Sequence, residues 1–488
     1  MGGVTIVLYH TKLRKATPNP INLIKTKKEK GVIFIIKVID SCCGTGKTTW
    51  AIQEMNGHPE QSYIFVTPFL DEVERIKQNT KVVFYEPTYK DNKRKIDDFN
   101  DLLCRGENIV TTHATFRNSN EDTIEYIQQG KYILILDEVI DIIEEFNNIC
   151  SHPKQKVNPT DIKFLKNKSV ITVDDFGKVS WIDDSYIDRS EKDRHDEDGT
   201  FKFADVEKYA KRGNLLSIDD TIFLWEFPQE IFSLFEETYV LTYIFEGSLL
   251  KPFFDYYKIE YELKGVGKKI VEVTDGKYKE IYCLVDYKQN SEDFQTYQKL
   301  ISICDNEKLN NYKYNALSIK WYKDAKKIKD NGSEITRLRN NLRNFLRDKN
   351  NAHALTIMWT CPKEYFNLLK GKGYTNTRQL NMEERELPPS EKVKILKKLS
   401  CHVPCNARAT NDFIDRHVLA YCCNMFYNPY IKKFFSKKNI VVNEDAFALS
   451  SIVQWVWRSR IRSNQSIILY IPSLRMRIIF KNWLYEIS

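Results

Sequence analysis

The chain has no long hydrophobic run. None of its 488 residues belong to an apolar stretch near the ~20 residues that span a bilayer. The run TIVLYH near the start is too short and too polar for a signal peptide. Internal repeats and low-complexity tracts are absent as well. With 42% hydrophobic and 13% aromatic residues, the sequence predicts packed globular domains, about three by length, and no membrane partner.

The cysteines have no regular spacing. Eleven are present, which predicts reduced thiols and a cytoplasmic protein. Cys401, Cys405, Cys422 and Cys423 fall in one short span with His402 nearby, but they do not form the paired CxxC units of a zinc site. A structural metal centre is therefore not expected.

A strong net charge is also missing. The formal charge of +8 decides little by itself, but its distribution is uneven. Residues 406–488 contain twelve Lys/Arg and five Asp/Glu, whereas residues 171–200 contain ten Asp/Glu and four Lys/Arg. The basic block suggests a phosphate-binding surface and the acidic segment a surface kept away from phosphates. Two ordinary solvated faces explain the same counts equally well.

Residues 41–49 read SCCGTGKTT and follow the apolar run of residues 31–40. A buried strand that enters a Gly-containing loop closed by Gly-Lys-Thr is typical of a phosphate-binding P-loop. Its backbone N–H groups form an anion-binding nest at a helix N-terminus. The residues expected to bind ATP are Ser41, Cys42, Cys43, Gly44, Thr45, Gly46, Lys47, Thr48 and Thr49. Ser41 stands where the pattern usually has its first glycine; a turn without nucleotide is the alternative.

Two residues of this loop have assigned chemistry. Lys47 is expected to neutralise the β- and γ-phosphates, and the hydroxyl of Thr48 to coordinate Mg²⁺. A second element lies about ninety residues later, where KYILILDEV (131–139) forms an apolar strand that ends on two acids. Asp137 is expected to hold the Mg²⁺ and Glu138 to orient and deprotonate the attacking water. Both elements in this order predict a nucleotide hydrolase with ATP and Mg²⁺ as cofactors.

Strand-like and helix-like stretches alternate from residue 32, which predicts a parallel α/β sheet. The expected strands are 32–39, 62–67, 108–112, 132–136 and 238–243. The expected helices are 47–56, 69–78 and 139–149. Residues 150–235 interrupt this rhythm with Asp-rich sequence and read as an insertion with small hairpins (VITVDD, VSWIDD).

The second half resumes a βα rhythm without a P-loop of its own. Residues 263–350 are Lys/Asn-rich and end in an amphipathic helical segment, EITRLRNNLRNFLRDK. The elements expected after it are strands at 355–360, 417–424 and 466–472 and helices near 362–370 and 446–462. The chain thus divides into a basic leader (1–31), a first lobe (32–262), a linker or accessory segment (263–350) and a second lobe (351–488).

Further motifs follow the order found in one family. YIFVTPFLDEVERI (63–76), IVTTHATF (109–116), VLTYIF (240–245), NARATN (406–411) and QWVWRSRIR (454–462) accompany the P-loop and the acid pair. Together they resemble the superfamily 2 (DExx-box) helicases and translocases, in a divergent, phage- or prophage-like form. SCCGTGKT is similar to motif I, LDEV to motif II, VTPFLDEV to motif Ia and VTTHATF to motif Ib. VLTYIF and NARATN are weaker likenesses of motifs III and V, and QWVWRSRIR is similar to motif VI.

This resemblance implies two RecA-like parallel-sheet lobes with an insertion in the first and ATP in the cleft between them. It implies contacts to single-stranded or forked DNA by Thr67, Pro68, Thr111, Thr112, His113 and Thr410. A threonine at a strand end, taken alone, is more often a cap of that strand, so these roles rest on the resemblance. RNA stays open as the polymer.

The resemblance also implies that the second lobe completes catalysis through Gln454, Arg458 and Arg462. A P-loop lobe alone hydrolyses slowly, and an arginine from another lobe offsets the charge on the γ-phosphate. On a helix these three residues lie at i, i+4 and i+8, near one face. The family pattern places its second arginine at residue 461, which is isoleucine, so both Arg460 and Arg462 are candidates; helical phase favours Arg462. A basic face exposed to solvent is the alternative.

The function predicted from these motifs is an ATP-dependent helicase or translocase on DNA. Replication or recombination of a phage or mobile element, with replication proteins as partners and a bacterial or phage-infected cytoplasm, fits that family. A second hypothesis is an ATP-gated loader that remodels a nucleic-acid complex without unwinding. A packaging ATPase with a fused nuclease is disfavoured, because the C-terminal block lacks clustered acids.

Overall fold

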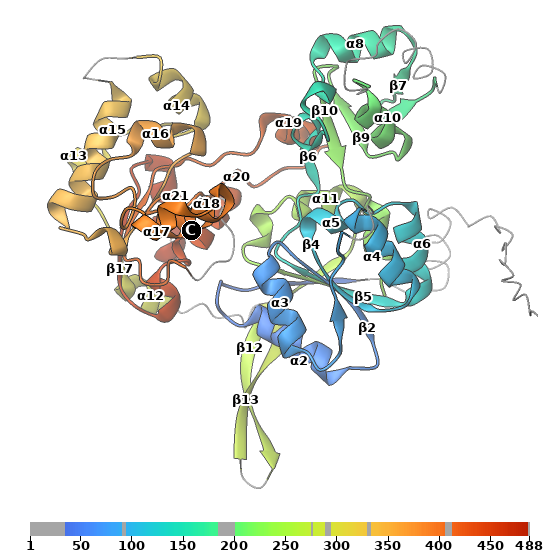
Figure 1. Cartoon of the computed structure of the whole chain (residues 1–488), viewed down its shortest axis with the longest axis horizontal. Helices are drawn as coiled ribbons and strands as arrows, with labels where there is room; N and C mark the ends of the chain where they lie inside the picture. The colour runs from blue at the N-terminus through green and yellow to red at the C-terminus, as the bar shows by residue number, and fades with distance from the viewer. Residues whose placement is uncertain are drawn as a thin grey trace, which may run out of the picture.

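The computed structural model describes residues 35–89, 94–183, 201–274, 277–287, 294–328, 333–405 and 412–486. The expected leader (1–31) lies outside these residues, as do Thr410 and the rest of NARATN (406–411). Figure 1 shows two α/β lobes side by side, with an insertion above the first lobe and a long β-ribbon below it.

The first lobe is built on an eight-stranded sheet with the order β13-β12-β1-β11-β5-β2-β4-β3. All neighbouring pairs are parallel except β12 and β13. Its strands are β1 (Ile36–Asp40), β2 (Ser62–Thr67), β3 (Phe84–Tyr85), β4 (Asn108–Thr112), β5 (Tyr132–Asp137), β11 (Glu237–Thr242), β12 (Tyr261–Thr274) and β13 (Lys277–Asp286). The central strands are largely apolar and buried, because both faces of the sheet are covered.

Helices cover this sheet on both faces, and two separate hydrophobic clusters form beneath them. The helices are α2 (Lys47–Gly57), α3 (Leu70–Asn79), α4 (Lys95–Cys104), α5 (His113–Phe116), α6 (Glu121–Gly130), the 3₁₀ turn η3 (Phe245–Gly247) and α11 (Leu250–Tyr257). The expected strands at 62–67, 108–112 and 132–136 and the helices after the P-loop and after β2 are confirmed to within a residue or two.

The helix expected at 139–149 is wrong. The chain instead forms the short strand β6 (Ile143–Glu145) and one turn of helix, α7 (Phe146–Ile149). β6 pairs antiparallel with β10 (Ile222–Glu226), about eighty residues later in the chain. This partner comes from within the insertion, so local periodicity does not reveal the strand.

The insertion folds on its own cluster of apolar side chains. It contains β6, β9 (Leu215–Ile218) and β10 in one antiparallel sheet. The two stretches expected in small hairpins pair with each other and form one hairpin, β7 (Ile171–Val173) with β8 (Val179–Trp181). Its helices are η1 (Pro153–Gln155), α8 (Pro159–Asn167), α10 (Ala204–Lys211) and η2 (Gln229–Ser233).

The second lobe has a four-stranded parallel sheet with the order β14-β17-β16-β15. Its strands are β14 (Ile301–Ile303), β15 (Ile357–Thr360), β16 (Val418–Tyr421) and β17 (Ile467–Tyr470). The helices are α12 (Phe294–Leu300), α13 (Glu307–Asn310), α14 (Ile319–Ala325), α15 (Glu334–Arg343), the π-helix η5 (Asn344–Lys349), η6 (Ala354–Thr356), η7 (Lys363–Tyr365), α16 (Phe366–Leu369), α17 (Met382–Glu386), α18 (Pro389–Leu399), α19 (Pro429–Lys437), α20 (Glu444–Val456), η8 (Arg460–Ser463) and α21 (Leu474–Leu484). The expected α/β fold class, two parallel-sheet lobes with an insertion in the first, is confirmed.

The segment expected as a linker (263–350) is shared between the lobes. Its first part forms most of the β12–β13 ribbon, which extends the first sheet, and its later part contributes β14 to the second sheet. The boundary expected after residue 262, between the first lobe and the linker, falls inside β12. Strand pairing therefore favours a first lobe that runs to residue 287 and a second that begins at 294.

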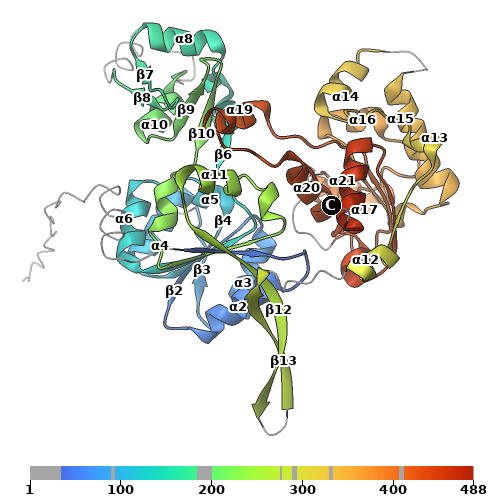
Figure 2. The same cartoon turned by 180° about the vertical axis from the view of Figure 1, so that it is seen from behind.

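One segment of the second half crosses back to the first lobe. After β16 the chain forms α19, whose Ile431, Phe434 and Phe435 are buried in the core of the first lobe. Figures 1 and 2 both place α19 beside β6 and β10 of the insertion. Lys433 and Lys437 form ion pairs with Asp219. We call residues 424–443 the crossing segment; it joins both lobes and the insertion.

Within the described residues, no helix is both long and apolar enough to traverse a membrane.

Candidate functional site

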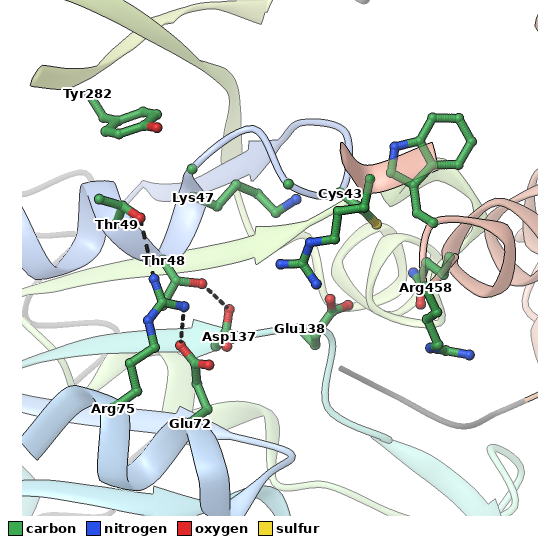
Figure 3. Close-up of a pocket in the computed structure, with 15 residues that line it drawn as sticks. Cys43, Lys47, Thr48, Thr49, Glu72, Arg75, Asp137, Glu138, Tyr282 and Arg458 are labelled. Carbon is green, nitrogen blue, oxygen red and sulfur yellow. Dashed lines mark hydrogen bonds and ion pairs between the residues drawn. The ribbon is translucent and has the colours of Figure 1, made fainter. Parts of the chain in front are cut away.

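A cleft of about 220 Å³ lies where the two lobes meet. Four parts of the first lobe line it: the P-loop, α3, the end of β5 and β13; the second lobe contributes the end of α20 and the residues after it. Figure 3 shows this cleft. The lining residues are Cys43, Gly44, Gly46, Lys47, Thr48, Thr49, Glu72, Arg75, Asp137, Glu138, Tyr282, Gln454, Trp457, Arg458 and Arg462.

The P-loop backbone turns through two left-handed glycines. Gly44 has φ 87° and Gly46 has φ 99°, conformations that residues with a Cβ rarely adopt. A Cβ at Gly46 would also clash with the ring of Tyr282. The loop therefore needs glycine at Gly46 both for its backbone angle and for the close approach of β13.

The structure gives Ser41 a role in the fold. Ser41 is completely buried, and its hydroxyl accepts a hydrogen bond of 2.9 Å from the backbone N–H of Val266 in β12. A glycine at this position would lack that acceptor. Cys42 is also fully buried, in a cluster that includes Tyr243 and apolar residues of the second lobe. The side chains of Ser41 and Cys42 thus do not line the cleft, and neither does Thr45, whose hydroxyl donates to the carbonyl of Cys42.

Lys47 lies across its own loop. Its Nζ donates to the carbonyl oxygen of Ser41 at 2.5 Å and to that of Cys42 at 3.1 Å. These carbonyls hold the ammonium group at the centre of the loop, in the region that a β- or γ-phosphate would enter. A bound phosphate would offer Lys47 a charged acceptor in place of neutral carbonyls, which strengthens the interaction.

Asp137 is the centre of a small polar network at the end of β5. Its carboxylate accepts hydrogen bonds of 3.4 Å from both Thr48 Oγ1 and Thr67 Oγ1. Burial raises the pKa of Asp137 to about 7, and the neighbouring carboxylates Glu138 and Glu72 contribute to the rise. A divalent cation beside it would reverse this shift. Thr48 and Asp137 supply hard oxygen atoms at one point, so they fit a Mg²⁺ ion that keeps several waters.

Glu138 has an unusual backbone conformation. It is not glycine, yet its φ is 66°, and its N–H donates to the carbonyl of Leu241 at 2.9 Å. Strained backbone conformations of this kind occur mostly at functional sites, where they orient a side chain toward the site. Figure 3 shows Glu138 in the cleft between Asp137 and Arg458.

The second lobe reaches the cleft with a different local structure from the one expected. The expected helix at 446–462 ends at Val456, so Arg458 lies in a turn and Arg462 in η8, where Ser459 caps the 3₁₀ turn. The helical-phase argument for Gln454, Arg458 and Arg462 is therefore wrong. All three nevertheless line the cleft, and Arg462 Cγ lies 3.6 Å from the position that a Cβ of Gly44 would take.

Arg460 points elsewhere. Its guanidinium donates to the carbonyl of Ser466 at 2.5 Å and to that residue's hydroxyl at 3.4 Å. It does not line the cleft. Of the two arginines left open by the sequence, the structure places Arg462 at the P-loop.

A chain of contacts joins the cleft to the loop after β11. Gln454 Nε2 donates to Ser450 Oγ at 3.1 Å, and Ser450 Oγ donates to the carbonyl of Tyr243 at 3.3 Å. Trp483 Nε1 donates to the Tyr243 hydroxyl at 3.1 Å. On the other side, Asp40 at the end of β1 accepts from the N–H groups of the two residues after Tyr243. Strand β1 and helix α20 thus hold the same loop.

The residues expected to contact nucleic acid are largely buried. Thr67 and Thr111 are at most 1% exposed, and the Thr67 hydroxyl donates to Asp137, so neither is open to a polymer in this conformation. His113 is 8% exposed and its Nε2 lies 3.0 Å from the carbonyl of Asp137. Pro68 and Thr112 are partly exposed. These five residues lie near the ends of β2, β4 and β5, beside the cleft.

Three lining residues were not anticipated from the sequence: Glu72, Arg75 and Tyr282. Trp457, which also lines the cleft, belongs to the QWVWRSRIR motif. Glu72 and Arg75 lie in the VTPFLDEVERI stretch and are one helical turn apart, which was the available signal. Arg75 donates to Glu72 at 2.9 Å and to Thr49 Oγ1 at 3.4 Å. Tyr282 reaches the cleft only because β13 folds back on β12, and no local pattern marks it.

The sequence is 33% identical over 455 residues to the SPbeta prophage-derived uncharacterized protein YonV of Bacillus subtilis (strain 168), covering 92% of this chain and 98% of that one. Two family descriptions match: the YonV middle domain at residues 154–225 and the YonV C-terminal Rossmann-like domain at residues 295–484.

Solved structures of an XPD helicase and of apo XPD are similar at TM-scores of 0.47 and 0.48, with 10% and 12% identity. The first alignment covers 98% of each chain, and the second covers 96% of this chain and 98% of the other.

Proposed function

This chain belongs to the YonV family, and we propose that it is an ATP-dependent helicase or translocase that acts on nucleic acid. One observation carries the proposal. Arg458 and Arg462 of the second lobe line the same cleft as Lys47, Asp137 and Glu138 of the first. A cleft that needs both lobes to be complete can link hydrolysis to movement of one lobe against the other.

Each residue has a role in hydrolysis. ATP and Mg²⁺, once bound, supply the phosphoanhydride bond and the cation that neutralises its charge. Lys47 binds the β- and γ-phosphates, and Thr48 with Asp137 holds the ion. Glu138 accepts the proton of the attacking water. Arg458 and Arg462 stabilise the charge that develops on the transferring group, with Gln454 positioned beside them.

We take DNA, single-stranded or forked, as the polymer, with RNA as the alternative. The relative is described as prophage-derived, which favours a role in replication or recombination of a phage or mobile element, beside replication proteins in the cytoplasm of the host cell. The polymer would cross the top of the lobes, near Pro68 and Thr112, which keep some exposure.

The second candidate is an ATP-gated loader that binds nucleic acid without separating strands. The crossing segment favours it, because α19 is buried in the first lobe although it belongs to the second half of the chain. Such an attachment restricts how far the lobes separate.

The test is to measure ATP hydrolysis without polymer and with single-stranded DNA, forked DNA, duplex DNA and RNA in parallel. A strand-displacement assay runs on the same samples. A helicase shows stimulated hydrolysis and displacement, and a translocase without unwinding or a loader shows stimulated hydrolysis alone. Absence of hydrolysis under all five conditions would refute both.

A further inference from the structure

The cleft has two chemically different ends. Figure 3 shows Glu138 and Arg458 on one side of Lys47, and Tyr282 and Arg75 on the other side, around Thr49. The first end holds the groups assigned above to hydrolysis. The second end holds an aromatic ring and a guanidinium that hydrolysis does not use.

The direction of the P-loop decides which part of a nucleotide the second end faces. In such a loop the lysine reaches the β- and γ-phosphates, while the backbone N–H groups hold the α- and β-phosphates. With the γ-phosphate near Glu138, the α-phosphate lies toward Thr49 and the nucleoside continues beyond it. Tyr282 and Arg75 stand at that end.

Tyr282 is held firmly in place. Its backbone N–H donates to Gln53 Oε1 of α2 at 2.9 Å, and its ring packs against Gly46 closely enough that no Cβ would fit. Lys268 Nζ lies 5.6 Å from the centre of the ring. The ring thus forms a fixed wall of the cleft, attached to the P-loop and to its helix.

Arg75 lies on the other side of Thr49 from Tyr282 (Figure 3). Its Nη1 donates to Glu72 and its Nη2 to Thr49 Oγ1, so two anchors orient the guanidinium, while the side chain stays 43% exposed. A guanidinium held in this way keeps a flat surface available for stacking. Aromatic rings and guanidinium planes both attract the face of a base.

We propose that Tyr282 and Arg75 form the base-binding subsite of this cleft and hold a purine by its faces. The proposal rests on the proposed nucleotide hydrolysis and specifies its substrate. Among the described residues that line the cleft, the one side-chain amide is that of Gln454, which belongs to α20 of the second lobe and donates to Ser450 Oγ. Stacking on the face of a base distinguishes poorly between bases, so ATP and GTP should both be accepted as substrates.

The experiment compares Tyr282→Ala, Tyr282→Phe and Tyr278→Ala in the full-length chain. Tyr278 lies on the same ribbon, is 70% exposed and does not line the cleft, so it is the matched control. KM and kcat are measured for ATP and GTP. Binding of ATP and of inorganic tripolyphosphate, which has no base, is measured by calorimetry.

Tyr282→Ala should raise KM and Kd for ATP roughly tenfold and leave tripolyphosphate binding within about twofold, since stacking on an aromatic ring is worth ~1–3 kcal/mol per base. Tyr282→Phe keeps the aromatic ring and should bind ATP as tightly as the wild type. Tyr278→Ala should also match the wild type. Arg75→Ala should raise KM for ATP about threefold because this side chain is more exposed. The wild type should accept ATP and GTP with KM values within about threefold of each other.

The result that overturns the subsite is unchanged ATP binding in Tyr282→Ala, or an equal loss of ATP and tripolyphosphate binding, which would assign Tyr282 to the shape of the P-loop. A preference for one purine above about thirtyfold would overturn recognition by faces. In each of these cases hydrolysis by the wild type continues, so the proposed function stands. Wild type without hydrolysis or nucleotide binding would instead remove the proposed function itself.

Discussion

The two lobes share one architecture but differ in the side chains at the carboxyl ends of their strands. In the first lobe, β1 and β5 end on the carboxylates Asp40 and Asp137, and β2 ends on the hydroxyl of Thr67. In the second lobe, β15 ends on the hydroxyl of Thr360 and β16 on that of Tyr421, and no carboxylate stands at either end. The next residues are Cys361 and Cys422, both buried, and burial raises the pKa of both thiols. Carboxylate oxygens are suited to binding cations, whereas buried thiols pack as small apolar side chains.

This difference shows that the parallel sheet itself does not decide the chemistry. The groups at the strand ends do, as in other open α/β sheets. The second lobe contributes to the cleft from the end of α20 and from η8, not from its strand ends. The first lobe should therefore govern nucleotide binding and supply groups essential for hydrolysis, whereas the second should affect the rate of hydrolysis with little effect on binding.

The largest effect is expected from Lys47→Ala. Loss of the ammonium at the centre of the P-loop should abolish hydrolysis, by more than about 10⁴-fold, and weaken ATP binding. Steady-state ATPase assays with calorimetric ATP titrations measure both. Lys77→Ala is the control, because Lys77 lies on the outside of α3 in an ion pair with Glu74. Retained hydrolysis in Lys47→Ala would contradict the division between the lobes at its strongest point.

The next largest effect concerns the second lobe. Arg462→Ala should lower kcat roughly a thousandfold, with ATP Kd changed less than about threefold, because its charge acts on the transferring phosphoryl group. Arg460→Ala is the matched control, since Arg460 donates to Ser466 and not into the cleft. Single-turnover hydrolysis beside equilibrium binding separates the two quantities. Equal effects of both substitutions would contradict the specific role assigned to Arg462.

A smaller effect is expected where the lobes communicate. Ser450→Ala removes the hydroxyl between Gln454 and the carbonyl of Tyr243. A single hydrogen bond of this kind is worth ~1 kcal/mol, so stimulation of hydrolysis by nucleic acid should fall about fivefold. Ser451→Ala, which removes a bond within α20 to Phe447, is the control. If the two variants behave alike, the contact does not connect the cleft to the loop after β11.

The last effect concerns the stability of the insertion and not hydrolysis, and pH reveals it. Glu226 at the end of β10 is 7% exposed, and burial raises its pKa to about 7. Between the unfolded value near 4.5 and this folded value, the folded chain keeps a proton that the unfolded chain releases. The free energy of unfolding therefore falls as pH rises through this window, by up to ~3 kcal/mol.

Glu226→Gln should remove this pH dependence. The variant should melt a few degrees above wild type at pH 8 and at the same temperature as wild type at pH 4. Scanning fluorimetry across pH 4–8 measures this. His402 of the second lobe has the opposite tendency, because burial lowers its pKa to about 4 and acid destabilises the fold around it. If the Glu226→Gln variant melts at the wild-type temperature at pH 8, ionisation of the buried Glu226 does not destabilise the fold.

The sequence predicted the parts whose cause is local. The apolar strands at 62–67 and 132–136 and the Gly-Lys-Thr loop lie where their residues indicated, since continuous buried runs and P-loop spacing are visible along the chain. It failed where a distant partner decides the structure. β6 needs β10 to be a strand, and Tyr282 reaches the cleft through the pairing of β13 with β12.

The arginines show both outcomes together. Their spacing suggested one helical face, yet the helix stops at Val456 without a proline or glycine nearby. Arg458 and Arg462 reach the cleft because a turn and η8 come after the helix, held by the cap of Ser459. The motif predicted which arginines belong to the site. It did not predict the local structure that brings them there, because that structure depends on tertiary packing.

The crossing segment has a consequence for dividing this chain into pieces. A fragment ending at residue 287 would lack α19, so the apolar surface of the first lobe that α19 covers would be exposed to water. A fragment beginning at residue 294 would carry Ile431, Phe434 and Phe435 with nothing to cover them. Exposed apolar patches of this kind promote aggregation. Neither half should remain soluble by itself, whereas mixing both halves during refolding should recover a 1:1 complex.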